Sequence, residues 1–313
     1  MNRRQFTGLV AAGTAGAAIP AQAHAVKKWQ NKQSLWPLCL DTATIRPQSL
    51  EDKIRLAAKH GFDAIEPWEG EINKYEKAGG DLKELGKRIK DAGLFVPSVI
   101  GLWKALPSSD EKFENNLAAC RNRMRQAQAI GAQHVQVIPE FDWPKVTPEG
   151  TLDRKKLSGY YKQILEIGLK EYDLQPAVVF LEFVHDLRTL KHAIEVARET
   201  GHKKAQIIPD TFHMHVGGSD IDRLGRIPGH AIGIFQFADA PAGIPREQLK
   251  DKDRVLPGDG ILPLTDSLRR LHDINYTGAI SLELYNPTYH QRDPDEFLKE
   301  AHAKTLAVVS SVG

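Results

Sequence analysis

Three side chains that could do chemistry lie within the six residues Asp210-Thr211-Phe212-His213-Met214-His215, which follow the apolar run "QII" and one proline. A carboxylate and two imidazoles are common metal ligands. If the segment were extended, however, Asp210 and His213 would point to opposite faces, because side chains alternate along a strand. The segment therefore makes no complete metal site by itself, and the other ligands must come from elsewhere in the chain.

Two glutamates stand alone in apolar surroundings, Glu182 in "VFLEF" and Glu283 in "ISLEL". A buried carboxylate without a partner is costly, so each needs a cation, a strong hydrogen-bond donor or a proton. An arginine inside the fold would serve, but Asp210 and Gln236 end neighbouring predicted strands, which favours a shared metal. An all-oxygen set suits Mn²⁺, Mg²⁺ or Ca²⁺ better than Zn²⁺. We predict one divalent ion, Mn²⁺ in the first place, with Mg²⁺, Co²⁺ or Ca²⁺ as alternatives.

The elements that must position these residues alternate along the chain. Helical segments have apolar residues at helical spacing, and several of them end in glycine. The short β-rich runs cover residues 35–40, 63–68, 95–101, 134–139, 177–183, 205–210, 232–237 and 279–284. The helical segments cover residues 49–61, 81–93, 112–131, 156–172, 186–201, 264–274 and 294–312. Between the sixth and seventh strands, residues 219–227 could form only a short helix. This alternation predicts a series of β/α units.

Eight such units predict a single-domain (β/α)8 barrel of the α/β class over residues 35–313, and a doubly wound open sheet is the alternative. No Gly-rich dinucleotide fingerprint follows the first strand, where "CLDTATIRPQ" stands. The carboxyl ends of a barrel's strands share one mouth, where active sites form. Polar residues that would meet there are Glu66, Glu140, Glu182, Asp210, Gln236 and Glu283. They favour the barrel.

Residues 1–25 are expected to be a cleaved export signal, followed by a linker over 26–34. A basic start, an apolar centre too short to span a bilayer and A-x-A sites are typical of such signals. Arg3-Arg4 with Phe6 resembles the twin-arginine signal, which predicts a periplasmic protein, and an ordinary secretory signal or an N-terminal anchor is the alternative. Removing Arg3 and Arg4 from the 42 Lys and Arg leaves 40, equal to the 40 Asp and Glu. This balance gives no support for binding nucleic acid or an anionic membrane.

Several motifs, in this order, resemble those of the xylose isomerase-like barrel superfamily: "LEF", "DTFHMH", "FADAP", "DKDRVLPGDG" and "SLELYNPTY". That group contains sugar isomerases, ketose epimerases, inosose isomerases, dehydratases and endonuclease IV-type enzymes. The segments "DAPAGIPREQLKDKDRVLPGDG" and "ELYNPTYHQRDPDEFLKEAHAKT" are most similar to inosose isomerase-like members. The resemblance covers about residues 35 to 313, with its motifs concentrated after residue 178.

The resemblance implies a metal site made by Glu182, Asp210, position 236 and Glu283. It also implies that the two glutamates move a proton, one on each face of the substrate. His213 would reach the substrate oxygen next to the reacting carbon, and the arginine of "DKDR", Arg254, would fix a substrate hydroxyl. The chain departs from the pattern at position 236, where relatives usually have His and this chain has Gln. A glutamine carbonyl is the weaker ligand.

Other residues could line the substrate site. Trp68 and Trp103 could form an apolar wall for a sugar ring, or pack together at the rim. Glu140 could bind substrate hydroxyls or pair with a rim cation. His185 follows a ligand strand and is a further candidate for contact with substrate or ligands. Cys39 and Cys120 lie in apolar surroundings, which predicts two buried free thiols.

A metal-dependent isomerase or epimerase is the first function predicted. It would act on a sugar, keto-sugar or inosose by proton transfer next to a carbonyl. The alternative is a lyase with the same site, either a dehydratase or an enzyme that cleaves 3-keto-glycosides. A non-catalytic carbohydrate-binding barrel is the third hypothesis, and near-neutral charge disfavours a nuclease. The expected partner is a small carbohydrate. We expect no binding to nucleic acid and, once the signal has been removed, none to a membrane. The sequence leaves open whether the protein is a homodimer.

Overall fold

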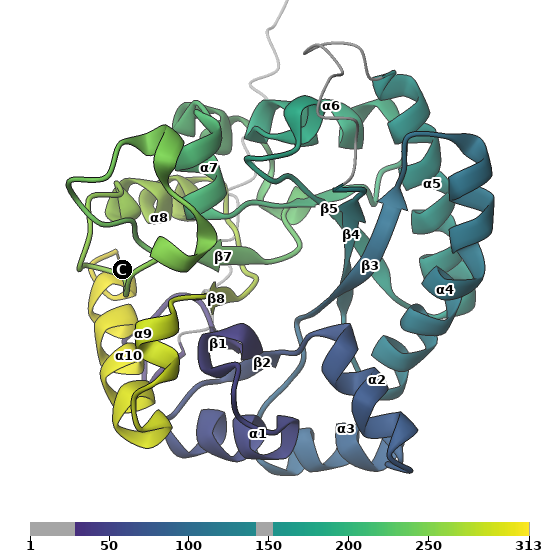
Figure 1. The fold of residues 1–313 in the computed structure, drawn as a ribbon. Helices are drawn as coiled ribbons and strands as arrows, with labels where there is room; N and C mark the ends of the chain where they lie inside the picture. The colour runs from purple at the N-terminus through teal and green to yellow at the C-terminus, as the bar shows by residue number, and fades with distance from the viewer. Residues whose placement is uncertain (1–28, 142–152, 313) are drawn as a thin grey trace, which may run out of the picture.

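The computed structural model describes residues 29–141 and 153–312. The predicted export signal lies outside the described residues, and so does the first part of the predicted linker. Eight strands form the centre of the described part, and helices surround them (Figure 1). The strands are β1 (Leu38–Asp41), β2 (Ala64–Glu66), β3 (Ser98–Leu106), β4 (His134–Pro139), β5 (Gln175–Val179), β6 (Gln206–Ile208), β7 (Phe235–Phe237) and β8 (Ile280–Leu282).

The strands close into a barrel. All paired neighbours run parallel, in the orders β2-β1-β8-β7 and β3-β4-β5-β6. One seam between these groups is bridged at Ala64–Phe95 and Trp68–Ile100, and the other at Ile207–Ile232 and Asp210–Gln236. The bridges complete a ring of eight strands, so the predicted (β/α)8 barrel is confirmed.

Most helices also agree with the prediction. Those expected are α1 (Leu50–Lys59), α3 (Leu82–Asp91), α4 (Asp110–Ala129), α5 (Arg154–Glu171), α6 (Leu190–Glu199), α8 (Leu264–Asp273) and α10 (Pro294–Val309). Three helices were not expected: α2 (Glu69–Lys77), α7 (Thr211–Gly217) and α9 (Pro287–His290). In α2 only Ile72 is buried, so its sequence has no apolar stripe from which a helix could be predicted.

The segment after β6 differs most from expectation. The extended run predicted over 205–210 is a strand only over 206–208, and α7 begins directly after Asp210. The Asp210 side chain accepts a hydrogen bond from the His213 backbone N–H at 2.8 Å, as an N-cap residue does. Gly218, with φ of 74°, ends the helix in the left-handed conformation. Asp210 and His213 therefore lie one helical turn apart on the same side.

Two apolar layers support the barrel. The smaller fills its interior with residues from successive strands, such as Cys39, Ala64, Ile100 and Ile208. The larger lies between the strands and the surrounding helices. Cys39 and Cys120 are buried free thiols, as predicted. Within the described ranges, no helix has the length and apolar character needed to cross a bilayer.

Candidate active site

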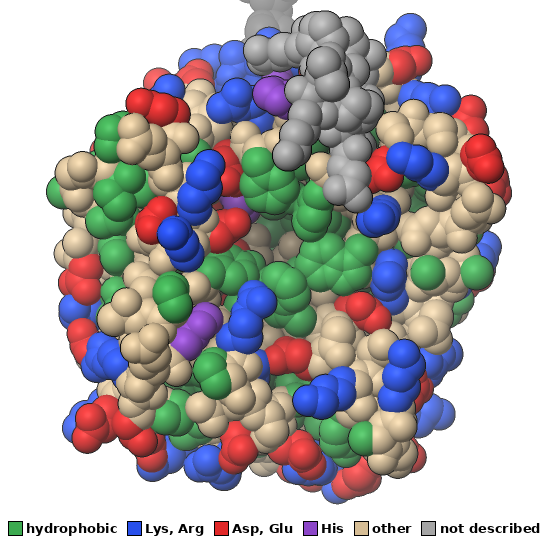
Figure 2. Space-filling model, viewed as in Figure 1, with side chains coloured by type: hydrophobic (Ala, Val, Ile, Leu, Met, Phe, Trp, Pro, Cys, Tyr) green, Lys and Arg blue, Asp and Glu red, His purple; other side chains and the backbone are tan. Residues whose placement is uncertain are grey.

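A cavity of about 260 Å³ opens at the carboxyl ends of the strands. Its lining divides into two halves. The polar half comes from the β6 to β8 units and consists of His213, Gln236, Asp251, Glu283 and Tyr285. The apolar half comes from the β2 to β5 units, where every lining residue except Gln136 is apolar. Figure 2 shows apolar side chains gathered round a hollow near the centre of this face.

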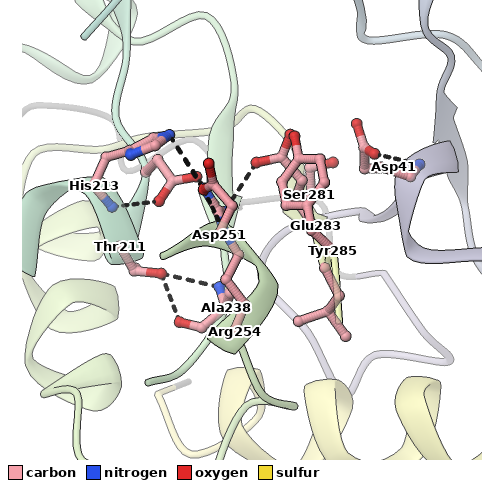
Figure 3. Close-up of polar contacts among 12 residues, drawn as sticks. Asp41, Thr211, His213, Ala238, Asp251, Arg254, Ser281, Glu283 and Tyr285 are labelled. Atoms are coloured by element: carbon pink, nitrogen blue, oxygen red, sulfur yellow. Dashed lines mark hydrogen bonds and ion pairs between the residues drawn. The ribbon is translucent and has the colours of Figure 1, made fainter. Parts of the chain in front are cut away.

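A buried arginine lies behind the polar half. Nη1 of Arg254 donates to Oδ2 of Asp210 at 2.7 Å and to Oε2 of Glu283 at 3.0 Å (Figure 3). Nη2 and Nε both donate to Oδ1 of Asp251, at 2.8 and 3.1 Å. The Arg254 side chain has no exposed surface, and it packs on the rings of Phe212 and Tyr285. Two of the buried acids thus have the arginine partner that the sequence left as an alternative to a metal.

His213 connects this arginine to the remaining glutamate. Its Nδ1 lies 2.5 Å from Oε2 of Glu182, and its Nε2 lies 3.2 Å from Nη2 of Arg254. Burial lowers the pKa of His213, but the charge of Asp210 and the contact with Glu182 outweigh this effect and raise the pKa to about 9. His213 faces the cavity, whereas Glu182 is not part of the lining. Glu182 can therefore hold and orient the imidazole that meets the substrate.

Glu283 is the carboxyl of the polar half with the most strongly altered acidity. Burial raises its pKa to about 8, although the charge of Arg254 opposes this shift. Its Oε1 accepts a hydrogen bond from the Tyr285 hydroxyl at 2.5 Å. Burial also acts to raise the pKa of Asp210, but the charge of Arg254 outweighs burial there, and the pKa of Asp210 is lowered. The two acids that share Arg254 thus differ in proton affinity, a pattern typical of acid–base sites.

The four predicted metal ligands do not surround one point. Asp210 and Glu283 meet at Arg254, whereas Glu182 is directed to the imidazole described above. Gln236 lies on β7 beside Asp210 and lines the cavity. Among the described residues, no three His, Cys, Asp or Glu side chains are arranged to hold a metal ion.

Glu66 is a structural residue of the barrel interior. It accepts hydrogen bonds from Nε2 of Gln136 and from the Ser281 hydroxyl, both at 2.8 Å. Burial raises the pKa of Glu66, and the hydrogen bonds from Ser281 and Gln136 reduce that shift. The amide nitrogen of Gln136 is therefore directed towards a buried carboxyl below the cavity.

Aromatic residues form a continuous row along the apolar half. Ring centroids are 5.4 Å apart for Trp68 and Trp103, 6.2 Å for Trp103 and Phe141, and 5.4 Å for Phe141 and Phe183. The two tryptophans were predicted as wall residues, and the structure places both in the lining. Both phenylalanines were missed, although each directly follows a strand-end glutamate on which the prediction rested. At the other end of the row, Trp68 packs against Tyr285.

Two predicted substrate contacts lie outside the cavity lining. Glu140 is held by Nζ of Lys112 at 2.8 Å and by the backbone N–H and hydroxyl of Ser108. This is the rim ion pair that the sequence left open. His185 is exposed in the loop after β5 and does not reach the cavity. Neither residue joins the group around Arg254.

The loop that carries Arg254 is fixed by one buried carboxylate. Asp239, after β7, accepts backbone N–H bonds from Gly258, Gly260 and Leu262 at 2.8 to 3.1 Å. Asp251, which lies three residues before Arg254 in the same loop, was also missed. Its position within the quoted "DKDR" motif was the available signal.

A closed barrel with buried acids, a histidine and a cavity at its carboxyl-end mouth has the architecture of a TIM-barrel enzyme. The model of the xylose isomerase-like TIM barrel family matches residues 54–306, so the chain belongs to this family. The resemblance stated from the sequence is confirmed.

Relatives of known activity extend this assignment. The chain is 27% identical to the inosose isomerase of Bacillus velezensis, over 87% of this chain and 97% of that protein. It is 26% identical to the D-psicose 3-epimerase of Agrobacterium fabrum, over 75% of this chain and 79% of that protein. A 3-dehydroshikimate dehydratase of Pseudomonas putida is 23% identical over 76% of this chain and 36% of that protein. The predicted class, a sugar isomerase or epimerase, agrees with the first two, and the lyase alternative agrees with the third.

Solved structures confirm the fold. The crystal structure of the IolI protein with a bound zinc atom superposes with a TM-score of 0.78 at 24% identity. The match covers 88% of this chain and 99% of that chain.

Proposed function

We propose that this chain is an isomerase or epimerase that moves a proton next to the carbonyl of a sugar, keto-sugar or inosose. One observation carries the proposal: Glu283 and His213, the latter in contact with Glu182, line the same cavity from different units of the barrel. Proton transfer beside a carbonyl needs two such groups, one to take the proton and one to supply it. The inosose isomerase and psicose epimerase relatives support the same class.

We propose a role for each group. The Glu283 carboxylate takes the proton from the carbon next to the substrate carbonyl. The protonated imidazole of His213 gives its proton to the carbonyl oxygen, so the electron pair of the broken C–H bond forms an enediol. His213 then recovers the hydroxyl proton as a carbon is reprotonated. Return of the proton from Glu283 to the neighbouring carbon completes an isomerisation. In an epimerisation, His213 instead gives its proton to the opposite face of the same carbon, and solvent then removes the proton from Glu283 and restores that of His213.

A divalent metal, with Mn²⁺ first, is the cofactor predicted from the sequence, and the IolI relative binds zinc. The donor set of this chain does not fit such an ion as it stands. The point where Asp210 and Glu283 converge holds Nη1 of Arg254, and Glu182 contacts the imidazole of His213 instead. No step of the proposed reaction therefore runs through a metal, and metal analysis of the purified protein tests the Mn²⁺ prediction.

A lyase is the second candidate, and the dehydratase relative favours it. Removal of a proton beside a ketone can expel a leaving group from the next carbon, which gives dehydration or cleavage of a 3-keto-glycoside. The cavity groups would be the same, with Glu283 as the base and His213 as the acid. The two candidates differ in product and not in the first step.

One experiment separates the two candidates. Purified protein is incubated in D₂O with ketoses, inososes and 3-keto-glucosides. Deuterium incorporation without cleavage supports isomerisation, whereas release of water or an aglycone supports elimination. If neither occurs and Glu283→Gln leaves sugar binding unchanged, both proposals are refuted.

Export is proposed as well, because Arg3-Arg4 and the apolar segment after them resemble a twin-arginine signal. A bacterium that expresses the full chain should yield shortened protein in its periplasmic fraction. Replacing both arginines by lysine should leave it in the cytoplasm. Export that persists in the double variant would support an ordinary secretory signal instead.

A further inference from the structure

The division of the cavity into halves bears on what the substrate looks like. Every lining residue of the polar half can donate or accept a hydrogen bond, and all five come from the β6 to β8 units. A free sugar carries hydroxyls on all its sides. Hydroxyls turned towards the apolar half would lose their bonds to water without replacement, which is costly.

Two hydrogen-bond donors of the apolar half already have partners. Gln136 is its one polar member, and the amide nitrogen of Gln136 donates to Glu66. The indole N–H of Trp68 is directed to Oδ1 of Asp41 at 3.3 Å. This half therefore offers mainly aromatic and aliphatic surface, and two of its hydrogen-bond donors, the Gln136 amide nitrogen and the Trp68 indole N–H, are engaged elsewhere.

The aromatic row also continues beyond the cavity. Phe141 is 50% exposed and Phe183 is 47% exposed, and their rings meet edge to face. Among the other large apolar side chains in the described residues, only Ile261, at 54%, is as exposed. Two exposed phenylalanines in contact at the mouth of a cavity are an apolar patch of the kind that marks a binding surface.

We propose that the substrate is amphipathic, a keto-sugar that carries an aryl group as its aglycone. The polar half holds the keto-sugar ring, and the aryl group packs on Trp103, Phe141 and Phe183. Aromatic rings prefer offset or edge-to-face partners at the spacing that this row provides. The inference rests on the proposed function and names the substrate class of the same site.

The test compares methyl β-D-glucoside with phenyl β-D-glucoside by titration calorimetry on the full-length purified protein. The phenyl compound should bind about tenfold more tightly. In the Phe141→Ala, Phe183→Ala double variant, this preference should fall to about twofold or less, with the affinity for the methyl compound unchanged. Ile261→Ala removes an exposed apolar side chain that is not part of the cavity lining and should retain the full preference.

Both phenylalanines are half exposed, so the double variant should fold, and its melting temperature checks this. Equal binding of the two glucosides by the wild type would overturn the inference, and so would a preference that survives in the folded double variant. The proposed function is tested separately by deuterium exchange. If keto-sugars exchange deuterium but the phenyl compound binds no more tightly than the methyl compound, only the inference about the aryl group is refuted. If the phenyl compound binds more tightly but neither exchange nor cleavage occurs, the proposed function is refuted.

Discussion

The polar and apolar halves of the cavity are built from consecutive units of one barrel, yet different forces hold them in place. In the polar half, the fully buried Arg254 fixes Asp210, Glu283 and the partly exposed Asp251 through charge-assisted hydrogen bonds. In the apolar half, the aromatic row is positioned by packing. Charged groups fix geometry and proton affinity, whereas apolar contacts supply binding energy without direction. The polar half should therefore control kcat, and the apolar half should control KM.

The largest effect expected is on Glu283. Glu283→Gln keeps the shape of the side chain but removes the base, so kcat should fall about 10³-fold. The measurement is the rate of deuterium exchange at the carbon next to the carbonyl. Glu114→Gln, an exposed change on α4, is the matched control and should leave the rate unchanged. A loss confined to KM would show that the polar half only binds substrate.

Arg254 is the residue on which the organisation of the polar half depends. Arg254→Met leaves Asp210 and Glu283 buried without their cation, so the free energy of unfolding should fall by about 3–5 kcal/mol. The vacated point lies between two carboxylates, and Mn²⁺ should then bind and raise the melting temperature of this variant but not of the wild type.

Urea denaturation and melting curves with and without Mn²⁺ measure both effects. Arg246→Met, an exposed change near α7, is the control. If Arg254→Met does not fold, Arg254→Lys keeps the charge, and it should fold without gaining Mn²⁺ binding. An equal response of wild type and Arg254→Met to Mn²⁺ would contradict the assignment of Arg254 as the resident cation.

The pH dependence of kcat/KM should show the two proton carriers of the polar half. Activity needs Glu283 without its proton, so it should rise as the pH increases through about 8. It also needs His213 with its proton, so it should fall above about 9. Glu182→Gln removes a contact that raises the pKa of His213, and the descending limb should move to lower pH.

Rate profiles from about pH 6 to about pH 10 measure this shift. Glu195→Gln on α6, whose carboxylate pairs with Arg154 near the surface, is the control and should leave both limbs in place. A Glu182→Gln profile identical to that of the wild type would show that Glu182 does not act through His213.

The halves also differ in how well the sequence predicted them. The strand ends were predictable because buried strands and helices each repeat apolar residues at a characteristic spacing in the sequence. The predicted strands placed Asp210, Gln236 and Glu283 at the same mouth of the barrel. The contact of Arg254 with Asp210 joins residues 44 positions apart through an irregular loop, and no local pattern encodes it. Phe141 and Phe183 were missed for another reason: phenylalanine is normally buried, so residue type does not indicate exposure.

The smallest effect expected is on the aromatic row. Trp103→Leu keeps an apolar side chain in the wall but removes its ring contacts with Trp68 and Phe141. KM should rise about fivefold while kcat stays within about twofold, because stacking contributes about 1 kcal/mol and touches no reacting atom. Phe113→Leu removes a ring stacked on Tyr160 outside the cavity, and should lower the melting temperature without changing KM. If Trp103→Leu lowers kcat as strongly as KM rises, the apolar half takes part in catalysis, and the separation of the two halves fails.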